Sequence, residues 1–188
     1  MNSLPEKPAE RETSLYQRGL ANDLSSLRSL PFFGRWLLLV DDNDFNAMLA
    51  FRLMQALGFE VITAANGAIA LQIFERRQFD VVLMDCQMPV MDGYDATRAI
   101  RERERRISVG RTPVIAVTGY AFAGNREKCL AAGMDDFLAK PYALSDLQPK
   151  LLRWVRPAAQ EISALSGSGS GTDLPSRFTQ TVFAPPVE

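Results

Sequence analysis

Histidine is absent from the 188 residues, and cysteine occurs only twice, at Cys86 and Cys129. Without histidine the chain cannot form a serine–histidine or cysteine–histidine hydrolase site, a histidine-ligated zinc site or a phosphohistidine carrier. Two cysteines without CxxC spacing are too few for a disulfide framework, and both are expected to be small buried side chains in a reducing compartment. Metal binding or acid–base chemistry must therefore rely on carboxylates, lysine or hydroxyl groups.

A large excess of charge and a long apolar run are missing too. The net charge is −1, and the segments 1–34, 35–156 and 157–188 carry 0, +1 and −2. No segment has the strong positive field that nucleic-acid binding usually needs. No apolar run approaches the ~20 residues of a bilayer span, and the first thirty residues lack a signal-peptide core. We therefore expect a cytoplasmic segment that contacts neither nucleic acid nor membrane.

Composition divides the chain into three regions. Residues 1–34 are polar and mixed in charge, with leucines at helical spacing, which predicts a linker or a single helix. Residues 35–156 have the texture of one folded domain. Residues 157–188 contain a Ser-Gly repeat that predicts a flexible linker and a short tail, either an artificial tether or a natural disordered end. If the tail 172–188 is a tethered ligand, we expect Phe178 and Phe183 to dock on the domain.

Apolar strand-like runs alternate with helix-period segments through the central region. This alternation predicts an α/β fold, a doubly wound (βα)5 domain with a five-stranded parallel sheet and helices on both faces. The expected strands are 36–40, 61–63, 81–84, 114–117 and 137–138. The expected helices are 46–57, with Leu49, Leu53, Ala56 and Leu57 on its apolar face, then 68–77, 94–106, 126–132 and 145–155.

Polar side chains occupy the carboxyl ends of four predicted strands, which is where open α/β sheets bind ligands. Asp41 and Asp42 follow the first strand, Asp85 the third, Thr118 the fourth and Lys140 the fifth. Three converging carboxylates favour the binding of a hard divalent cation such as Mg²⁺. A carboxylate flanked by a metal, a hydroxyl and an ammonium group is suited to accepting a phosphoryl group.

These stretches resemble the receiver domain of two-component response regulators. The matching segments are LLLVDDNDFN, VVLMDCQMPVMDGYDATRAIR, TPVIAVTGYA and AAGMDDFLAKP, in the order of the family, and the resemblance covers about 35–156. It implies the flavodoxin-like receiver fold. The second segment is most similar to the receivers of hybrid sensor histidine kinases. The chain is therefore expected to be either a single-domain receiver or the terminal receiver of a hybrid sensor kinase. In the second case the full-length parent could be membrane-anchored.

The resemblance also implies roles for individual residues. Asp85 is implied to be phosphorylated from a phosphohistidine of a histidine kinase or phosphotransfer domain. Asp41, Asp42, Asp85 and the backbone carbonyl of Gln87 are implied to hold Mg²⁺. Thr118 and Lys140 are implied to bind phosphoryl oxygens, with a cis Lys140–Pro141 peptide, and Thr118 with Phe137 to form the switch that changes partner binding. No independent turnover enzyme is expected, only slow loss of the acyl phosphate.

Two charged segments have competing interpretations. Arg101 to Arg106 alternates arginine and glutamate, which favours a solvated helix face over a nucleic-acid patch. Asp135 and Asp136 precede the fifth strand, so we expect them to cap the turn into it rather than to bind metal.

Two other functions are weaker candidates. A haloacid-dehalogenase-like phosphatase also uses an aspartate with Mg²⁺, and residues 42–44 give its DxD pattern, but the order of its lysine and second acidic pair differs here and a cap insertion is missing. A scaffold that has lost phosphorylation would be expected to lack a member of the acidic set, which is complete in this chain.

Overall fold

The computed structural model describes residues 29–119 and 123–157, without the side chains of 123–125. Most of the predicted N-terminal linker or helix and the tail beyond Pro157 lie outside the described residues, so those two predictions stay predictions. The strands are β1 (Trp36–Val40), β2 (Glu60–Ala64), β3 (Val81–Asp85), β4 (Val114–Thr118) and β5 (Asp136–Ala139). The helices are α2 (Asp44–Ala56), α3 (Gly67–Arg76), α4 (Gly93–Ile107), α5 (Ala123–Ala131) and α6 (Leu144–Trp154).

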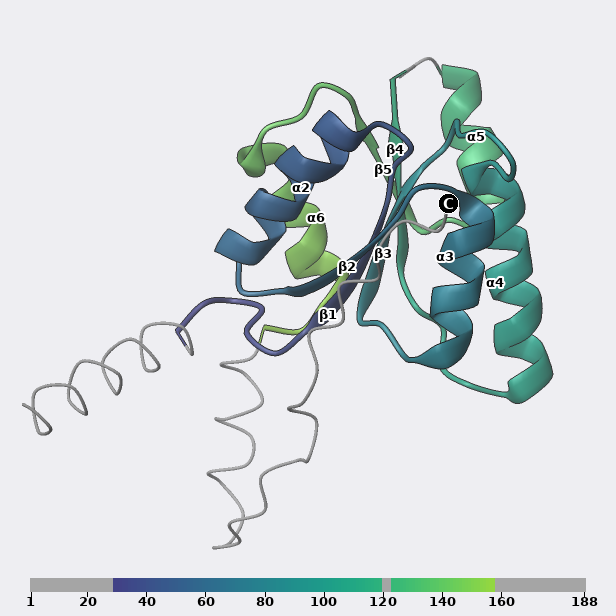
Figure 1. Cartoon of the computed structure of the whole chain (residues 1–188), viewed down its shortest axis with the longest axis horizontal. Coiled ribbons are helices and arrows are strands. Elements are labelled where there is room, and N and C mark those ends of the chain that lie inside the picture. The colour runs from purple at the N-terminus through teal and green to yellow at the C-terminus, as the bar shows by residue number, and fades with distance from the viewer. Residues whose placement is uncertain (1–28, 120–122, 158–188) are drawn as a thin grey trace, which may run out of the picture.

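All five strands are parallel and lie in the order β2-β1-β3-β4-β5. Helices α2 and α6 cover one face of the sheet, and α3, α4 and α5 cover the other (Figure 1). The predicted doubly wound (βα)5 fold is confirmed, with each expected strand and helix within a few residues of its observed bounds. Crossover connections of this kind bring all five carboxyl ends to one edge of the sheet.

The sheet separates two apolar cores. Side chains of β1, β3 and β4 alternate between them, because successive residues of a strand point to opposite faces. The first core, under α2 and α6, includes Leu37, Leu83 and Ile115, and the second, under α3, α4 and α5, includes Leu38, Val82 and Val114. Every residue of β3 and of β4 is buried, which holds their carboxyl ends rigidly.

Helix α2 presents a different face to the core from the one that the sequence predicted. Its buried positions are Ala50 and Met54, with Leu57 buried just after the helix, whereas Leu49 is 52% exposed and Ala56 is also exposed. The prediction of Leu49 and Ala56 as core residues was therefore wrong. The side chain of Asn43 caps the helix by accepting hydrogen bonds from the backbone N–H groups of Phe45 and Asn46.

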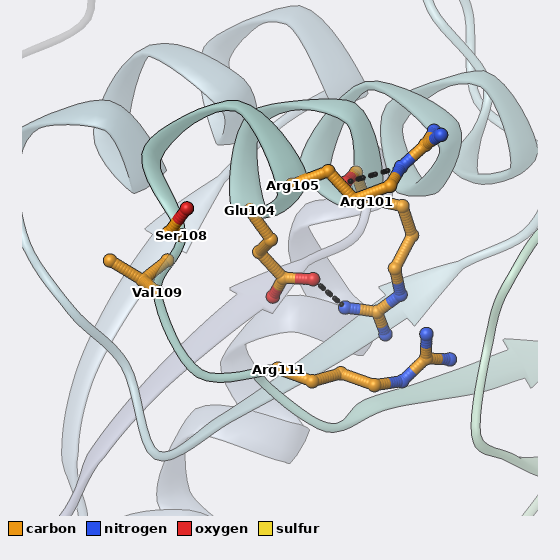
Figure 2. A pocket seen from close by; sticks show the side chains of 6 residues that line it. All are labelled: Arg101, Glu104, Arg105, Ser108, Val109 and Arg111. Atoms are coloured by element: carbon orange, nitrogen blue, oxygen red, sulfur yellow. Dashed lines mark hydrogen bonds and ion pairs between the residues drawn. The ribbon is translucent and has the colours of Figure 1, made fainter.

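The acidic–basic run of α4 is only partly a solvated face. Arg101 and Glu104 are buried, and the Arg101 guanidinium donates to Glu104 at 2.7 Å (Figure 2). It also donates to Asp135 at 2.7 Å and to the carbonyl oxygens of Gly133 and Thr112. The predicted solvated face was therefore wrong for Arg101 and Glu104. Ion-pair partners, and backbone carbonyls of the segments that lead into β4 and β5, compensate the burial of these two side chains.

Asp136 accepts a local hydrogen bond from the backbone N–H of Phe137 at 2.8 Å, as expected of a cap of the turn into β5. The partners of Asp135 are distant in sequence, so its predicted capping role was wrong. Asp135 accepts from the guanidinium groups of Arg101 and Arg111 and from the backbone N–H of Val114. Asp136 is the first residue of β5 and accepts from Lys150 at 2.8 Å and from the Trp154 indole at 3.2 Å. Hydrogen bonds and the charge of Lys150 outweigh the effect of burial and lower the pKa of Asp136. Both carboxylates hold elements together.

Replacing Arg101 with alanine should lower the free energy of unfolding by about 3–5 kcal/mol, because Glu104 would stay buried after losing its arginine partner. The matched control is Arg105→Ala on the same helix, since Arg105 pairs with Glu102 at the same i,i+3 spacing but both side chains are exposed. That change should cost about 0–1 kcal/mol. Urea unfolding of both variants measures the difference, and equal losses would contradict a buried role for Arg101.

Candidate functional site

Four strand ends bring their polar residues to one edge of the sheet, as the sequence predicted. Asp41 directly follows β1, Asp85 ends β3, Thr118 ends β4, and Lys140 directly follows β5. Asp41, Asp85 and Thr118 are buried, with exposed fractions of 7%, 7% and 3%. Carboxylates buried to this degree are costly unless they are paired or coordinate a cation.

Lys140 supplies the pairing cation. Its ammonium nitrogen lies 2.7 Å from Oδ2 of Asp41 and 2.6 Å from Oδ2 of Asp85, so a single charge bridges two carboxylates. The backbone N–H of Lys140 also donates to the carbonyl oxygen of Thr118 at 2.7 Å, which fixes the start of this segment against β4. The predicted cis peptide between Lys140 and Pro141 is present.

The remaining carboxylate oxygens of the pair accept backbone hydrogen bonds. Asp41 Oδ1 accepts from the N–H of Asn43 at 3.0 Å, and Asp85 Oδ1 accepts from the N–H of Gln87 at 3.1 Å. Both bonds come from the loop just after the strand, so each carboxylate is oriented by its own turn. Asn43, which sequence analysis did not single out, therefore both orients Asp41 and caps α2.

Burial and charge oppose each other at this edge. Burial raises the pKa of Asp85 above its ordinary value, and the hydrogen bonds from Lys140 and Gln87 only partly offset that effect. Burial alone would lower the pKa of Lys140, but its hydrogen bonds to Asp41 and Asp85 and their charges outweigh burial and leave the pKa raised. The ammonium group therefore stays charged, and a second cation would further favour the ionised form of Asp85.

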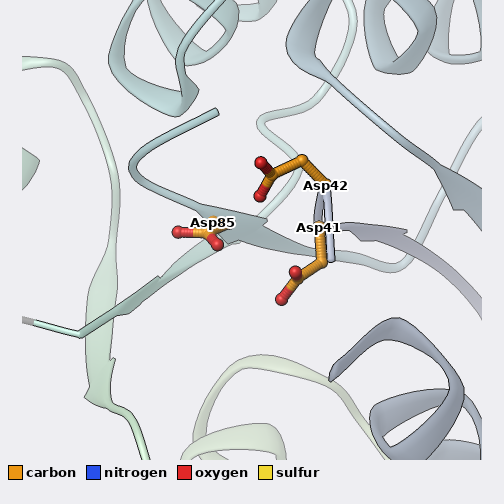
Figure 3. A group of neighbouring side chains, drawn as sticks. All are labelled: Asp41, Asp42 and Asp85. Carbon is orange, nitrogen blue, oxygen red and sulfur yellow. The ribbon is translucent and has the colours of Figure 1, made fainter. Parts of the chain in front are cut away.

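Asp41, Asp42 and Asp85 form a group whose ligand oxygens lie within 4.8 Å of one another (Figure 3). Asp41 and Asp85 are buried, whereas Asp42 is exposed at the mouth of the group. Three hard oxygen donors, one of them open to solvent, suit Mg²⁺, which takes a few carboxylates and keeps several waters. The residues present thus fit the metal that the sequence predicted.

Thr118 and Phe137 lie on the same face of the sheet, one step apart diagonally. Thr118 pairs with Ala139 and Phe137 pairs with Ala116 in the β4–β5 register, and residues two apart on a strand share a face. The Phe137 ring is half-buried, with Lys150 Nζ at 5.4 Å and the Arg126 guanidinium carbon at 6.0 Å from its centre. The predicted pair is therefore close enough in the sheet for one side chain to affect the other.

The loop after Asp85 approaches the strand end closely. A Cβ atom on Gly93 would lie 2.0 Å from the carbonyl oxygen of Asp85, so only glycine fits at the start of α4. Within this loop Val90 has a φ of 70° and is 86% exposed. Positive φ is unfavourable for a β-branched residue, and such strain is often found at functional sites.

An apolar stripe on the outer side of α2 starts beside the acidic group and was missed by sequence analysis. Phe45, Met48 and Leu49 are 68%, 57% and 52% exposed. Their spacing of i, i+3 and i+4 places them on one side of the helix. This spacing is visible in the sequence, but without the phase of the helix the stripe cannot be distinguished from a core-facing one.

A model of the response regulator receiver domain matches residues 37–152, which is more than half of the chain. The chain belongs to the response regulator receiver domain family. A curated relative is the hybrid signal transduction histidine kinase A of Dictyostelium discoideum, 36% identical over 125 residues that cover 66% of this chain and 6% of that protein. The first curated relatives are sensor and histidine kinases, most of them hybrid kinases, and the chain spans 3–15% of their lengths.

Solved receiver structures agree with this assignment. The receiver domain of sensor histidine kinase PA1611 from Pseudomonas aeruginosa, with a magnesium ion coordinated in its active-site cleft, is 45% identical, with a TM-score of 0.59 over 64% of this chain and 97% of that one. The receiver domain of Ssk1 from Saccharomyces cerevisiae, crystallised with the phosphotransfer protein Ypd1, is 26% identical, with a TM-score of 0.63 over 67% of this chain and 90% of that one.

The chain is thus a receiver domain of a two-component phosphorelay, similar to those of hybrid histidine kinases, and Mg²⁺ is the cofactor that its acidic group fits. Within the described residues, no helix is long and apolar enough to cross a membrane.

Replacing Asp42 with asparagine should weaken Mg²⁺ binding by about tenfold or more, because even the loss of a residue that only orients a metal ligand costs about 10–100-fold. Asp42 is exposed, so its replacement should leave the fold intact. Asp44→Asn removes an exposed acid two residues away and is the matched control. Isothermal titration calorimetry with MgCl₂ gives both affinities, and the same affinity in the two variants would exclude Asp42 as a ligand.

Proposed function

We propose that Asp85 is the phosphoacceptor of this receiver domain. What carries the proposal is the double ion pair of Lys140 with Asp41 and Asp85, which stabilises the ionised form of a buried carboxylate at the open edge of the sheet. A carboxylate oxygen of Asp85 attacks the phosphorus of a phosphohistidine, the P–N bond breaks, and the imidazole leaves and takes up a proton. The product is an acyl phosphate on Asp85.

Neighbouring residues have distinct roles in this proposal. Asp41, Asp42, Asp85 and the backbone carbonyl of Gln87 would hold Mg²⁺, which when bound compensates the charge of the phosphoryl oxygens. Lys140 offers a compact ammonium group to one of these oxygens, since its partners Asp41 and Asp85 already hold it at that edge. The Thr118 hydroxyl, at the neighbouring strand end, offers a hydrogen bond to another oxygen.

The response to phosphorylation would travel along β4 and β5. When Thr118 turns toward the phosphoryl group, space opens on the face of the sheet that it shares with Phe137. The half-buried Phe137 ring can then move inward and change the surface formed by α5, β5 and α6. This change of surface is the output that a partner protein would sense.

The phosphodonor would be a histidine kinase or a histidine phosphotransfer domain that docks on the stripe Phe45, Met48 and Leu49. These side chains are exposed at the helix that begins next to the acidic group, so a protein bound there can present a phosphohistidine to Asp85. An exposed apolar cluster is typical of a protein–protein contact. The complex of the Ssk1 receiver with Ypd1 supports a phosphotransfer protein as the kind of partner.

The proposal extends to the protein that carries this domain. The similarity to hybrid histidine kinases favours a receiver attached to such a kinase and located in the cytoplasm, where the phosphodonor is available. The domain would not turn over an external substrate. It would be reset by slow hydrolysis of the acyl phosphate or by transfer onward.

Incubation with acetyl phosphate and Mg²⁺ should add one phosphoryl group to the intact mass of the protein. The gain should disappear with EDTA and in Asp85→Asn, because the acceptor oxygen is then an unreactive amide. Asp95→Asn, which removes an exposed acid on α4, should behave like the wild type. Phosphorylation of Asp85→Asn at the wild-type level would show that another residue is the acceptor.

The double variant Met48→Asp/Leu49→Asp should be phosphorylated normally by acetyl phosphate but at least about tenfold more slowly by a phosphorylated histidine phosphotransfer domain that reacts with the wild type. Loss of two interface side chains typically costs more than about 1 kcal/mol each. Leu152→Asp, a comparably exposed apolar residue on α6, is the control. An equal loss in the control, or none in either variant, would contradict docking on α2.

A further inference from the structure

A groove lies at the end of the sheet opposite to Asp85, where β3 and β4 begin. It has a volume of about 530 Å³ and is bordered by the end of α3 and the segment after α4. A smaller hollow of about 440 Å³ adjoins it and shares Val109 and Arg111 with it (Figure 2). The charged residues that line the larger groove are Glu75, Arg76, Arg77, Asp80, Arg103 and Arg111.

The groove carries uncompensated positive charge. Of its four arginines, only Arg111 is paired with a carboxylate of the described residues, that of Asp135. Of its two carboxylates, Asp80 is already used by the Arg35 guanidinium and the Trp36 backbone N–H. Among the described residues, no ion pair joins Arg76, Arg77 or Arg103 to a carboxylate. An acidic ligand would therefore find guanidinium groups that are free to pair.

Arg103 and Arg77 are held in place by contacts other than an ion pair. Arg103 donates to the backbone carbonyl of Glu75 at 2.7 Å. The Arg77 guanidinium stacks on the Trp36 ring at 3.2 Å, and its buried Nε atom has no hydrogen-bond partner. Guanidinium groups fixed in this way lose little further conformational entropy when they bind a carboxylate.

Apolar side chains accompany these charges. The stacked rings of Phe74 and Phe79 belong to the lining, and Ile107 and Val109 at the rim are 44% and 38% exposed. The groove thus fits a segment that combines acidic and apolar side chains. It is less suited to a small anion, which would leave the apolar rim exposed to water.

The chain itself leaves the domain beside this groove. The backbone carbonyl of Arg156 accepts from Arg35 Nε at 3.2 Å, and the same guanidinium lies 3.3 Å from Asp80, which lines the groove. The Arg35 guanidinium group therefore contacts both Arg156, near the end of the folded domain, and Asp80 in the wall of the groove.

We propose that residues 172–188 dock in this groove. The segment 172–188 has two acidic residues, Asp173 and Glu188, against one arginine, and it contains Phe178 and Phe183 for the apolar positions. The 14 residues 158–171, taken as a flexible chain, span about 20 Å root-mean-square, which is enough to reach the groove from Arg156. Such a tether gives an effective concentration in the millimolar range, so a segment with a Kd of about 1 mM would be about half bound.

A nitroxide on Thr181→Cys tests this proposal on the full chain, because Cys86 and Cys129 are buried and should not react with the label. The label should broaden the ¹⁵N-amide resonances of Gln78, Gly110 and Thr112 in the groove but not those of α2. Broadening should be lost in Arg76→Glu/Arg103→Glu and kept in Arg52→Glu, an exposed arginine on α2. It should also be lost in Phe178→Ser/Phe183→Ser, which does not alter the folded domain.

Each other outcome overturns the proposal. Broadening of another surface would place the segment elsewhere, and no broadening would show that it does not dock. Broadening that appears when labelled chain without ¹⁵N is mixed with unlabelled ¹⁵N chain would assign the groove to the tail of a second copy. Broadening that persists in Arg76→Glu/Arg103→Glu and in Phe178→Ser/Phe183→Ser would show that proximity to Arg156 alone, rather than binding, brings the label close.

Discussion

The ion pairs that the Lys140 ammonium group makes with Asp41 and Asp85 determine what the carboxyl edge of the sheet can do. Two buried carboxylates side by side repel each other, and burial removes the water that would otherwise screen them. Burial, and to a smaller degree the charge of Asp41, raise the pKa of Asp85, and the hydrogen bonds from Lys140 and Gln87 offset this only in part. This edge of the sheet therefore favours the binding of a further cation, such as Mg²⁺. Under the proposed function, the metal would therefore have to be present for reaction with a phosphoryl donor.

This arrangement relies on the rigidity of the sheet beneath it. The charged groups arrive from strands that are far apart in sequence, and the parallel register of β1, β3, β4 and β5 fixes their separation. The central strands are buried on both faces, so their ends cannot shift without disturbing both cores. Gly93 lets the following helix begin against the carbonyl of Asp85, which closes the loop tightly around this residue.

The sequence was sufficient to predict the fold and the convergence of Asp41, Asp85, Thr118 and Lys140, because both follow from the order of strand and helix patterns. It was insufficient where burial depends on a distant partner. Arg101 is buried because Asp135, 34 residues away, accepts from its guanidinium group, and no local pattern records this contact. Leu49 resembles a core residue by spacing alone, yet the phase of α2 places Ala50 and Met54 inward instead. Such errors concern which side of a helix faces the core. In α2 the exposed side carries the stripe Phe45, Met48 and Leu49 that we propose as the docking site.

Strand β5 is the element that can connect the acidic edge with the outer surface. Asp136 ties β5 to α6 through Lys150 and the Trp154 indole, and Phe137 beside it lies between cations of α5 and α6. If the Phe137 ring moves, it loses its contact with Lys150, while the hydrogen bonds of Asp136 keep α6 attached to β5. Under the proposed function, this favours rearrangement of side chains on a fixed backbone over displacement of α6. The energy involved in a cation–ring contact is about 0.5–2 kcal/mol, a size that phosphorylation of a nearby residue can overcome.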